Sequence, residues 1–208
     1  MQVLEDTKSA KLEYAYKDEK IRILGVIPAK SRSTRLPEKN LIELTGKPLF
    51  TYVTKVSLHV CDKTIVSTDS KEIKEIALKL GAEIIDRKPE LCQDDTPSFE
   101  IAKDIAEQYD FEIMCFIEPT MPLLSDATLL KMLDAMLFDK QPAIITVNKT
   151  LKPTGTALCI RKDILMKEKT LFPKGMAVFI VSFEEGMDID YIWDLRIAEA
   201  LMGGKVYD

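Results

Sequence analysis

Residues 29–40 form a loop in which basic and hydroxyl side chains gather. The segment reads AKSRSTRLPEKN, with four basic groups and three hydroxyls. Backbone N–H groups and hydroxyls can donate hydrogen bonds to phosphate oxygens, while lysine and arginine neutralise the phosphate charge. The loop therefore predicts a phosphate site, with a solvated basic loop as the alternative. It lacks the GxxxxGKS/T pattern of P-loop enzymes and the GxGxxG pattern of dinucleotide folds, so both classes are disfavoured.

Two carboxylates near the end of the chain have a spacing that suits a metal ion. Asp188 and Asp190 lie two residues apart, so both side chains point to one side of an extended segment. That geometry favours a hard divalent cation such as Mg²⁺. The alternative is that the two acids only satisfy the N-terminal donors of the helix that follows.

Three other polar residues have a purely structural interpretation. Asp69 follows a strand and could cap the next turn. Thr96 precedes Pro97, which predicts a helix with the threonine as cap and the proline at the first helical position. Arg87 could be a surface charge.

Several classes of chemistry are disfavoured by composition. A Ser-His-Asp or Cys-His mechanism would have to use the only histidine, His59, which closes an apolar helical stretch. No CxxC pair predicts a zinc or redox site, so reduced thiols in or near the core are expected at Cys61, Cys92, Cys115 and Cys159.

Charge and hydropathy also bound the partners. A net charge of -5 gives no general affinity for nucleic acid, so a small anionic ligand suits the basic loop better. No run approaches the ~20 apolar residues of a membrane span, and we expect no membrane partner and a cytoplasmic location.

The candidate residues must be positioned by an alternation of strands and helices. Residues 1–20 are expected to be a polar leader before a single domain at 21–208. Strands are predicted at 21–27, 63–67, 83–85, 113–117, 143–147, 157–160 and 177–181. Helices are predicted at 50–59, 70–80, 99–109, 125–137 and 191–202. This rhythm predicts a three-layer α/β sandwich around a mainly parallel sheet, with ligands at the carboxyl ends of the strands.

Five blocks, in chain order, resemble the landmarks of one family, the acylneuraminate (CMP-sialic acid synthetase-type) cytidylyltransferases. The first block is Ile27-Pro28-Ala29 with Ser33, Arg35-Leu36-Pro37 and Lys39-Asn40. The others are residues 66–69, 94–98, 119–123 and 188–190. The resemblance covers residues 21 to about 201, and it implies a Rossmann-like fold of the nucleotide-diphospho-sugar transferase type.

The resemblance also implies a reaction, in which CTP and an acidic 2-keto sugar give a CMP-sugar and pyrophosphate with Mg²⁺. Lys30, Arg32 and Lys39 would hold the triphosphate, with Lys39 closest to the transferring phosphate. Arg32, Lys39 and Asp190 would then be the catalytic residues. The nucleotide contacts it implies are Ala29, Lys30, Ser33, Asn40, Arg87, Thr96, Ser98 and Glu118.

Within that scheme Asn40 would lie beside the ribose or base, and residues 87–98 would form a second wall of the nucleotide pocket. Asp190 would be the main magnesium ligand. Asp188 would be either a second ligand or a base for the attacking hydroxyl.

The chain departs from the family at three places. Lys30 stands where arginine is usual, and Glu118 stands where a base-reading glutamine is usual. A carboxylate accepts hydrogen bonds but donates none unless it is protonated. Residues 148–153 replace a longer insertion that reaches across a dimer, so a homodimer is an open expectation. Lys149 or Lys152 could meet a sugar carboxylate, or both could lie in a solvated turn.

Three functions therefore stand as hypotheses. The first is the cytidylyltransferase of 2-keto sugar acids. The second is the same transfer with another base or a smaller acceptor, which Glu118 and the short 148–153 segment motivate. The third is a non-catalytic nucleotide-binding paralogue, against which the retention of Lys39, Asp188 and Asp190 argues.

Overall fold

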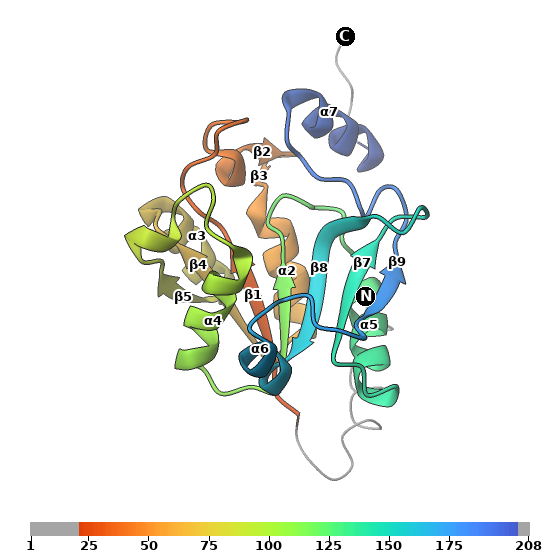
Figure 1. Ribbon diagram of the computed structural model, residues 1–208. Helices are drawn as coiled ribbons and strands as arrows, with labels where there is room; N and C mark the ends of the chain where they lie inside the picture. The colour runs from red at the N-terminus through yellow and green to blue at the C-terminus, as the bar shows by residue number, and fades with distance from the viewer. Residues whose placement is uncertain (1–20, 204–208) are drawn as a thin grey trace.

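A mixed seven-stranded sheet forms the centre of the molecule (Figure 1). The computed structural model describes residues 21–203, so the leader expected at residues 1–20 lies outside the described part of the chain. The strand order is β5-β4-β1-β6-β8-β7-β9, with a separate β2-β3 hairpin. The strands are β1 (Ile23–Pro28), β2 (Glu43–Leu44), β3 (Lys47–Pro48), β4 (Lys63–Thr68), β5 (Glu83–Asp86), β6 (Ile113–Ile117), β7 (Ala143–Val147), β8 (Pro153–Arg161) and β9 (Ala177–Ile180).

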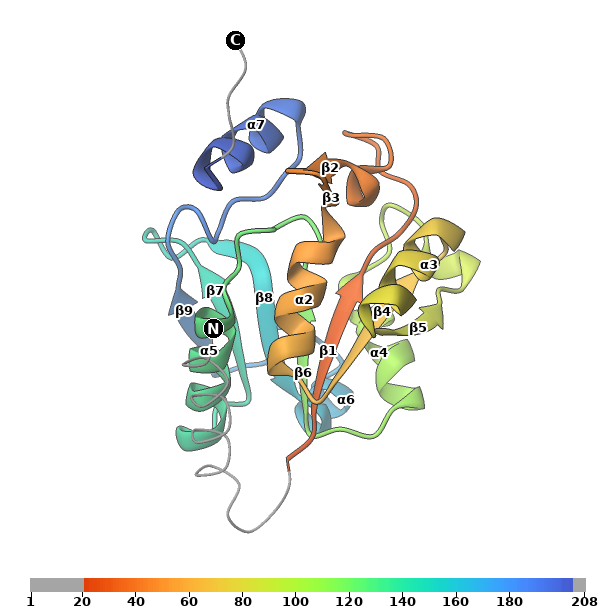
Figure 2. The same ribbon diagram turned by 180° about the vertical axis from the view of Figure 1, so that it is seen from behind.

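Helices cover both faces of this sheet. Helices α2, α3 and α5 pack on the face seen in Figure 2, and α4 and α6 pack on the face seen in Figure 1. Helix α7 lies beyond the strand ends, beside the β2-β3 hairpin. The helices are α2 (Phe50–Val60), α3 (Lys71–Leu80), α4 (Ser98–Gln108), α5 (Asp126–Phe138), α6 (Lys162–Glu168) and α7 (Ile192–Leu201), with 3-10 turns η1 (Lys39–Leu41) and η2 (Pro89–Leu91). The predicted three-layer α/β sandwich is confirmed.

One strand of the mainly parallel sheet runs antiparallel to its neighbours. Strand β8 pairs antiparallel with both β6 and β7, whereas the β1-β4, β1-β6, β4-β5 and β7-β9 pairs are parallel. The turn at residues 148–152 is too short for a parallel crossover, which needs a dozen or more residues, and it makes a hairpin instead. Because β7 and β6 run the same way, this turn lies at the edge of the sheet where β6 ends.

Close contact between α2 and β1 depends on a glycine. A Cβ atom at Gly25 would lie 1.8 Å from the Ser57 Oγ. That hydroxyl is 2.8 Å from the Thr64 Oγ1, so the buried polar pair is satisfied. The absence of a side chain in β1 therefore lets α2 pack directly against the strand that leads into the basic loop.

Helix boundaries follow the expected caps in two cases and not in a third. Ser70 accepts a hydrogen bond from Ile73 N at the start of α3, and Gly81 ends that helix at a φ of 96°. Ser125 likewise caps α5. The capping role predicted for Thr96 is wrong, because Pro97 is the extended N-cap of α4 and the Thr96 hydroxyl donates to Glu90 O at 3.4 Å.

No helix within residues 21–203 is long and apolar enough to cross a membrane.

Candidate functional site

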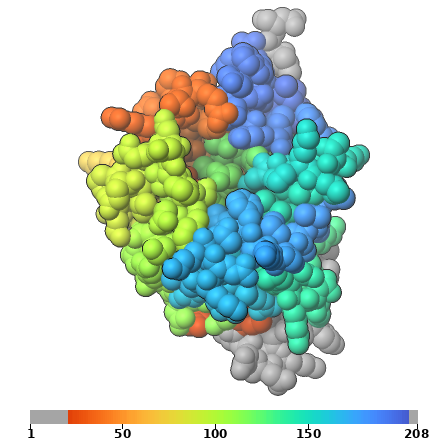
Figure 3. Space-filling model, viewed as in Figure 1, coloured from red at the N-terminus to blue at the C-terminus, as the bar shows by residue number. Residues whose placement is uncertain are grey.

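The candidate residues meet at the edge of the sheet where β1, β4, β5 and β6 end. The loop after β1 carries the basic residues, and the loops after β4, β5 and β6 carry Asp69, Arg87 and Glu118. The segment between β9 and α7 brings Asp188 and Asp190 to the same edge. The space-filling view is hollowed there, between the orange, yellow-green and blue parts of the chain (Figure 3).

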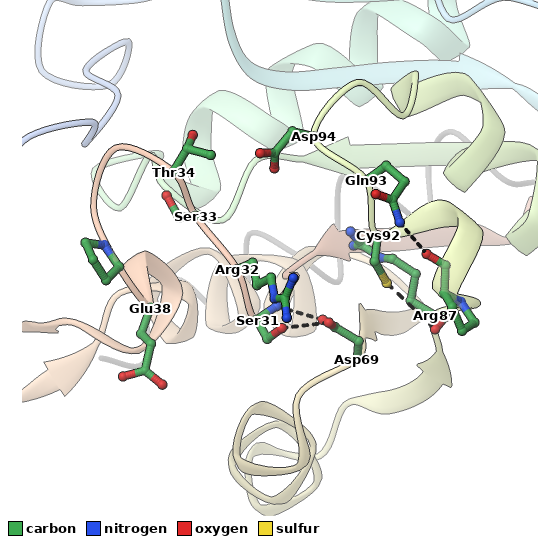
Figure 4. Close-up of a pocket in the computed structure, with 12 residues that line it drawn as sticks. Ser31, Arg32, Ser33, Thr34, Glu38, Asp69, Arg87, Cys92, Gln93 and Asp94 are labelled. Carbon is green, nitrogen blue, oxygen red and sulfur yellow. Dashed lines mark hydrogen bonds between the residues drawn. The ribbon is translucent and has the colours of Figure 1, made fainter.

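Two adjoining cavities share a wall that the basic loop forms. The larger, about 830 Å³, is lined by Asp69, Arg87 and residues 92–94, and the smaller, about 270 Å³, is lined by Lys39, Asn40, Glu118 and Asp188. Both are lined by Arg32, Ser33, Thr34 and Asp94. Figure 4 shows Asp94 across from Ser33 and Thr34 in the larger cavity. The loop is therefore placed to contact one ligand that extends through both cavities.

Asp69 binds the start of the basic loop. Its carboxylate accepts hydrogen bonds from Ser31 N at 2.7 Å and from Ser31 Oγ at 2.6 Å (Figure 4). Burial raises the pKa of Asp69, but the Ser31 hydrogen bonds and the charge of Arg87 outweigh it and lower the pKa overall. The turn cap expected for Asp69 is wrong, because Ser70 N donates to Thr68 Oγ1 instead.

Three lysine and arginine side chains of the loop are paired with aspartates from other loops. Lys30 Nζ lies 2.5 Å from Asp94 Oδ1. Lys39 Nζ lies 2.8 Å from Asp190 Oδ1, and Arg35 pairs with the other oxygen of the same carboxylate. The alternative of a basic loop held only by solvent does not describe these positions, because each cation already holds an anionic oxygen.

Asp188 lies beside this pair without sharing it. Its Oδ1 accepts a hydrogen bond from Thr120 Oγ1 at 2.6 Å and lies 3.9 Å from Lys39 Nζ. Burial raises the pKa of Asp188, and the nearby Asp190 charge acts in the same direction. The two carboxylates thus differ, since Asp190 is neutralised by two cations and Asp188 by one distant lysine and a hydroxyl.

Glu118 is half-buried just after the end of β6, and its pKa is raised. Burial, together with the charge of Asp188, raises the pKa of Glu118 to about 7. Lys39 and Arg87 act in the opposite direction and reduce the rise. A carboxyl with this pKa can both donate and accept hydrogen bonds near neutral pH.

Arg87 is a buried wall residue, so the surface-charge alternative is wrong. It is 6% exposed, and its guanidinium donates to Ser67 Oγ at 3.2 Å and to Ser67 O at 2.8 Å. Burial lowers its pKa. Thr96 is half-buried and Ser98 exposed, and neither is among the residues that line the two cavities.

Asn40 presents an unsatisfied acceptor. Its Nδ2 donates to Lys30 O at 2.9 Å, which fixes the amide, while Oδ1 is buried with no partner among residues 21–203. An unpaired buried acceptor costs roughly 1–3 kcal/mol. Because Asn40 lines the smaller cavity, a ligand hydroxyl or amino group is the natural donor to it. Ala29 lies fully buried at the base of the loop.

Asp188 and Asp190 have the chemistry that a magnesium site requires. No cluster of three or more metal-ligating side chains occurs in the described part of the chain. Mg²⁺ commonly uses one or two carboxylates and takes its remaining ligands from water and substrate phosphates. The pair fits that requirement, provided that Lys39 and Arg35 move from Asp190 to the phosphates.

Sequence patterns missed several parts of the site. Thr120 lies in the 119–123 block but was given no role, and Arg35 was not expected to pair with Asp190. A hydroxyl between two prolines after an apolar strand was the available signal for Thr120. Lys149 and Lys152 are exposed in a turn held by the Asn148 side chain, which matches the solvated-turn alternative.

Comparisons with known proteins point to one family. The cytidylyltransferase family profile matches residues 24–162. The N-acylneuraminate cytidylyltransferase of Escherichia coli is 31% identical over 221 aligned residues, covering 88% of this chain and 53% of that protein. The CMP-N,N'-diacetyllegionaminic acid synthase of Legionella pneumophila is 36% identical over 117 residues, covering 52% of this chain and 50% of that one. The chain thus spans about half the length of these relatives.

Solved structures support the fold. A CMP:2-keto-3-deoxy-manno-octonic acid synthetase complexed with CTP superposes with a TM-score of 0.71 at 17% identity, covering 88% of this chain and 98% of that one. A nucleotidyl transferase from Methanothermobacter superposes with a TM-score of 0.69 at 19% identity, covering 88% and 98%.

Proposed function

Because the chain belongs to the cytidylyltransferase family, we propose that it joins CMP from CTP to a sialic-acid-like 2-keto sugar acid and releases pyrophosphate. The observation that carries the proposal is the smaller cavity, where Lys30, Lys39 and Asn40 face Glu118 and Asp188. It joins cations for a triphosphate, one carboxylate of the Asp188 and Asp190 pair and the unsatisfied Asn40 acceptor, and Asp190 contacts it through Lys39.

The two cavities suggest how the substrates lie. The nucleoside would lie between Arg87 in the larger cavity and Asn40 and Glu118 in the smaller one, and the sugar acid would enter the smaller cavity near Lys39. The α-phosphate would then lie at their common wall, beside Arg32 and Ser33, which line both cavities. Thr96 and Ser98 would take part only if the 92–98 segment moves on binding.

The proposed transfer is a displacement at phosphorus. The anomeric hydroxyl oxygen of the sugar acid forms a bond to the α-phosphorus while the bond to the bridging β-phosphate oxygen breaks. Pyrophosphate leaves with that electron pair, and the hydroxyl proton passes to a base. Asp188 is the candidate base, because Thr120 fixes its carboxylate and burial raises its pKa.

The loop cations would stabilise the charge of this reaction. Lys39 and Arg35 can exchange the Asp190 carboxylate for phosphate oxygens, and Lys30 can exchange Asp94 in the same way. Asp190, with Asp188 beside it, would hold Mg²⁺. When bound, Mg²⁺ neutralises phosphate charge and aligns the transferring group. Positioning and electrostatics supply most of the catalysis in such transfers.

Pyrophosphate release tests the proposal. The full chain is mixed with CTP, Mg²⁺ and a panel of 2-keto sugar acids, and we expect release with at least one of them. Asp190→Asn should abolish turnover while its unfolding transition stays near that of the wild type. Asp139→Asn, an exposed aspartate at the end of α5, is the matched control and should keep full activity. Full activity in Asp190→Asn would remove the metal role.

Glu118 motivates a second candidate, the same transfer with a different base. A nucleotide present at 100 times its dissociation constant stabilises the protein by ~2.7 kcal/mol. If another triphosphate with Mg²⁺ shifts the melting temperature and CTP does not, the base assignment fails. Binding of CTP without pyrophosphate release with any sugar acid would instead favour the non-catalytic paralogue.

We also propose that the protein forms a homodimer, is cytoplasmic and has no nucleic-acid or membrane partner, and that residues 21–208 form one domain.

A further inference from the structure

One side chain joins the segment that carries Asp188 and Asp190 to the start of α5. Glu185 Oε1 accepts hydrogen bonds from Ser125 N at 3.0 Å and from Ser125 Oγ at 2.6 Å. Its Oε2 accepts from Thr128 Oγ1 at 2.9 Å. Both carboxylate oxygens are therefore bonded to the first turn of a helix, where the helix dipole favours negative charge.

The backbone of the same residue is held as well. The Thr156 hydroxyl of β8 donates to Glu185 O at 3.1 Å. Gly186 follows with no room for a side chain, since a Cβ there would lie 2.9 Å from Thr154 Cγ2. The chain thus enters the Asp188–Asp190 stretch from a point fixed on both α5 and β8.

Contacts further along fix the carboxylates to the segment after β6. Ile189 N donates to Thr120 O at 3.0 Å, and Thr120 Oγ1 donates to Asp188 Oδ1. Met187 and Ile189 are buried beneath α7. Glu185 lies only three residues before Asp188, so loss of its side chain would break the link to α5 and leave the backbone contact with Thr156 and these later contacts.

A role limited to capping α5 does not account for Glu185. Ser125 already caps that helix, because its Oγ accepts a hydrogen bond from Thr128 N at 3.2 Å. The additional carboxylate comes from a different part of the chain, and it links the two segments that flank the smaller cavity. Its neighbour Glu184 is exposed and contacts Ser182 within its own segment rather than α5.

We propose that Glu185 is a positioning residue that fixes Asp188 and Asp190 for the metal and the triphosphate. This inference rests on the proposed function. It predicts that loss of Glu185 weakens the response to Mg²⁺ more than the binding of nucleotide alone. Residues that orient metal ligands typically contribute about 10–100-fold to metal affinity.

The test compares Glu185→Ala and Glu185→Gln with the matched control Glu184→Ala. The first readout is the Mg²⁺ concentration that gives half of the maximal thermal stabilisation by CTP. We expect a rise of at least about 10-fold in Glu185→Ala, a smaller rise in Glu185→Gln, whose amide keeps one acceptor for Ser125, and no change in Glu184→Ala.

The second readout needs no ligand. Amide hydrogen exchange at Ile189 and Asp190 should accelerate in Glu185→Ala and stay unchanged in Glu184→Ala. An equal loss of melting temperature with and without Mg²⁺, together with unchanged exchange and an unchanged Mg²⁺ midpoint, would overturn the inference. Failure of the proposed function would look different, because the wild type itself would then show no stabilisation by CTP and Mg²⁺.

If Glu185→Ala does not fold, Thr128→Val provides the test. This variant removes only the hydrogen bond from Thr128 Oγ1 to Glu185 Oε2, and it keeps the Ser125 cap of α5. It should raise the Mg²⁺ midpoint by a few fold and accelerate exchange at Ile189. Wild-type values for both in Thr128→Val would also count against the inference.

Discussion

The half of the sheet formed by β5, β4, β1 and β6 differs from the half formed by β8, β7 and β9 in where its polar and apolar side chains lie. Loops after the first half carry Asp69, Asp94 and the basic loop, in which Asp69 binds Ser31 and Asp94 pairs with Lys30. The second half and α7 expose apolar side chains. Ten of the thirteen large hydrophobic residues that are exposed within residues 21–203 lie between Phe172 and Met202.

The comparison shows how the two halves contribute to one site. The first half supplies the cations and hydroxyls of the basic loop, of which Ser31 and Lys30 are held by Asp69 and Asp94. The second half supplies two carboxylates from one segment, held by Glu185 and Thr120. Most of the cations that could meet a ligand come from the first half, and the carboxylate pair proposed to hold a metal comes from the second.

The largest effect is expected at the contact between the halves, Lys39 with Asp190. Lys39→Met should lower turnover by about 10²-fold or more, because the transition-state charge loses a positioned cation. Lys152→Met removes an exposed lysine from the β7-β8 turn and should leave turnover unchanged. Initial rates of pyrophosphate release measure both. Equal losses would mean that the turn also belongs to the site.

The next effect concerns pH and Glu118. Its pKa in the folded protein, about 7, lies above its ordinary value of 4.5, so the folded state holds the proton more tightly than the unfolded state. Glu118 therefore reduces stability progressively as pH rises from about 4.5 to above 7. Glu118→Gln should be more stable than the wild type at pH 8 and gain little at pH 5. Denaturant unfolding at the two pH values measures this, and a gain that is equal at both would contradict the buried carboxyl.

A smaller effect is expected where Asp94 holds Lys30. Asp94→Asn frees the lysine and removes a negative charge beside the phosphates, so CTP should bind a few fold more tightly, consistent with an exposed ion pair of about 0.2–1 kcal/mol. Asp95→Asn is the neighbouring control. Isothermal titration with CTP measures the change, and weaker binding would indicate that Asp94 contacts the nucleotide itself.

The smallest effect is expected on the outer face of α7. Ile197 is 44% exposed, so Ile197→Ser should change the free energy of unfolding by no more than about 0.5 kcal/mol and leave turnover unchanged. Thermal unfolding over a range of protein concentrations measures this. A larger, concentration-dependent change would mean that this face is covered by another copy of the chain in solution.

Local signals predicted much of the fold. Ser70, Gly81 and Ser125 marked helix ends by hydrogen bonds made within a few residues, and the apolar runs of β6 and β7 were predicted with their observed bounds. Thr96 failed because its neighbour Pro97 adopts an extended conformation that is itself a cap. The antiparallel β8 could have been predicted from the short 148–152 turn, since strand direction follows from connection length and not from the apolar run.

Sequence patterns indicated several of the residues that gather at this edge of the sheet, but not the contacts between them. The types and order of Lys39, Asp188 and Asp190 indicated phosphate and metal chemistry. Their partners were not predictable, because the pairing of Ser31 with Asp69 depends on β1 and β4 being neighbours in the sheet. Glu185 had no sequence signal of its own, since its role depends on contact with α5, about 60 residues earlier in the chain.

The pairing of Lys39 and Arg35 with Asp190 has a thermodynamic consequence. The triphosphate needs Lys39 and Arg35, and Mg²⁺ needs Asp190. Because these groups are paired with one another, binding of either ligand releases the group that the other ligand requires. Their binding should therefore be mutually favourable, and by linkage the factor by which Mg²⁺ raises nucleotide affinity must equal the factor by which nucleotide raises Mg²⁺ affinity. A titration of either ligand at two fixed levels of the other measures that coupling from both sides.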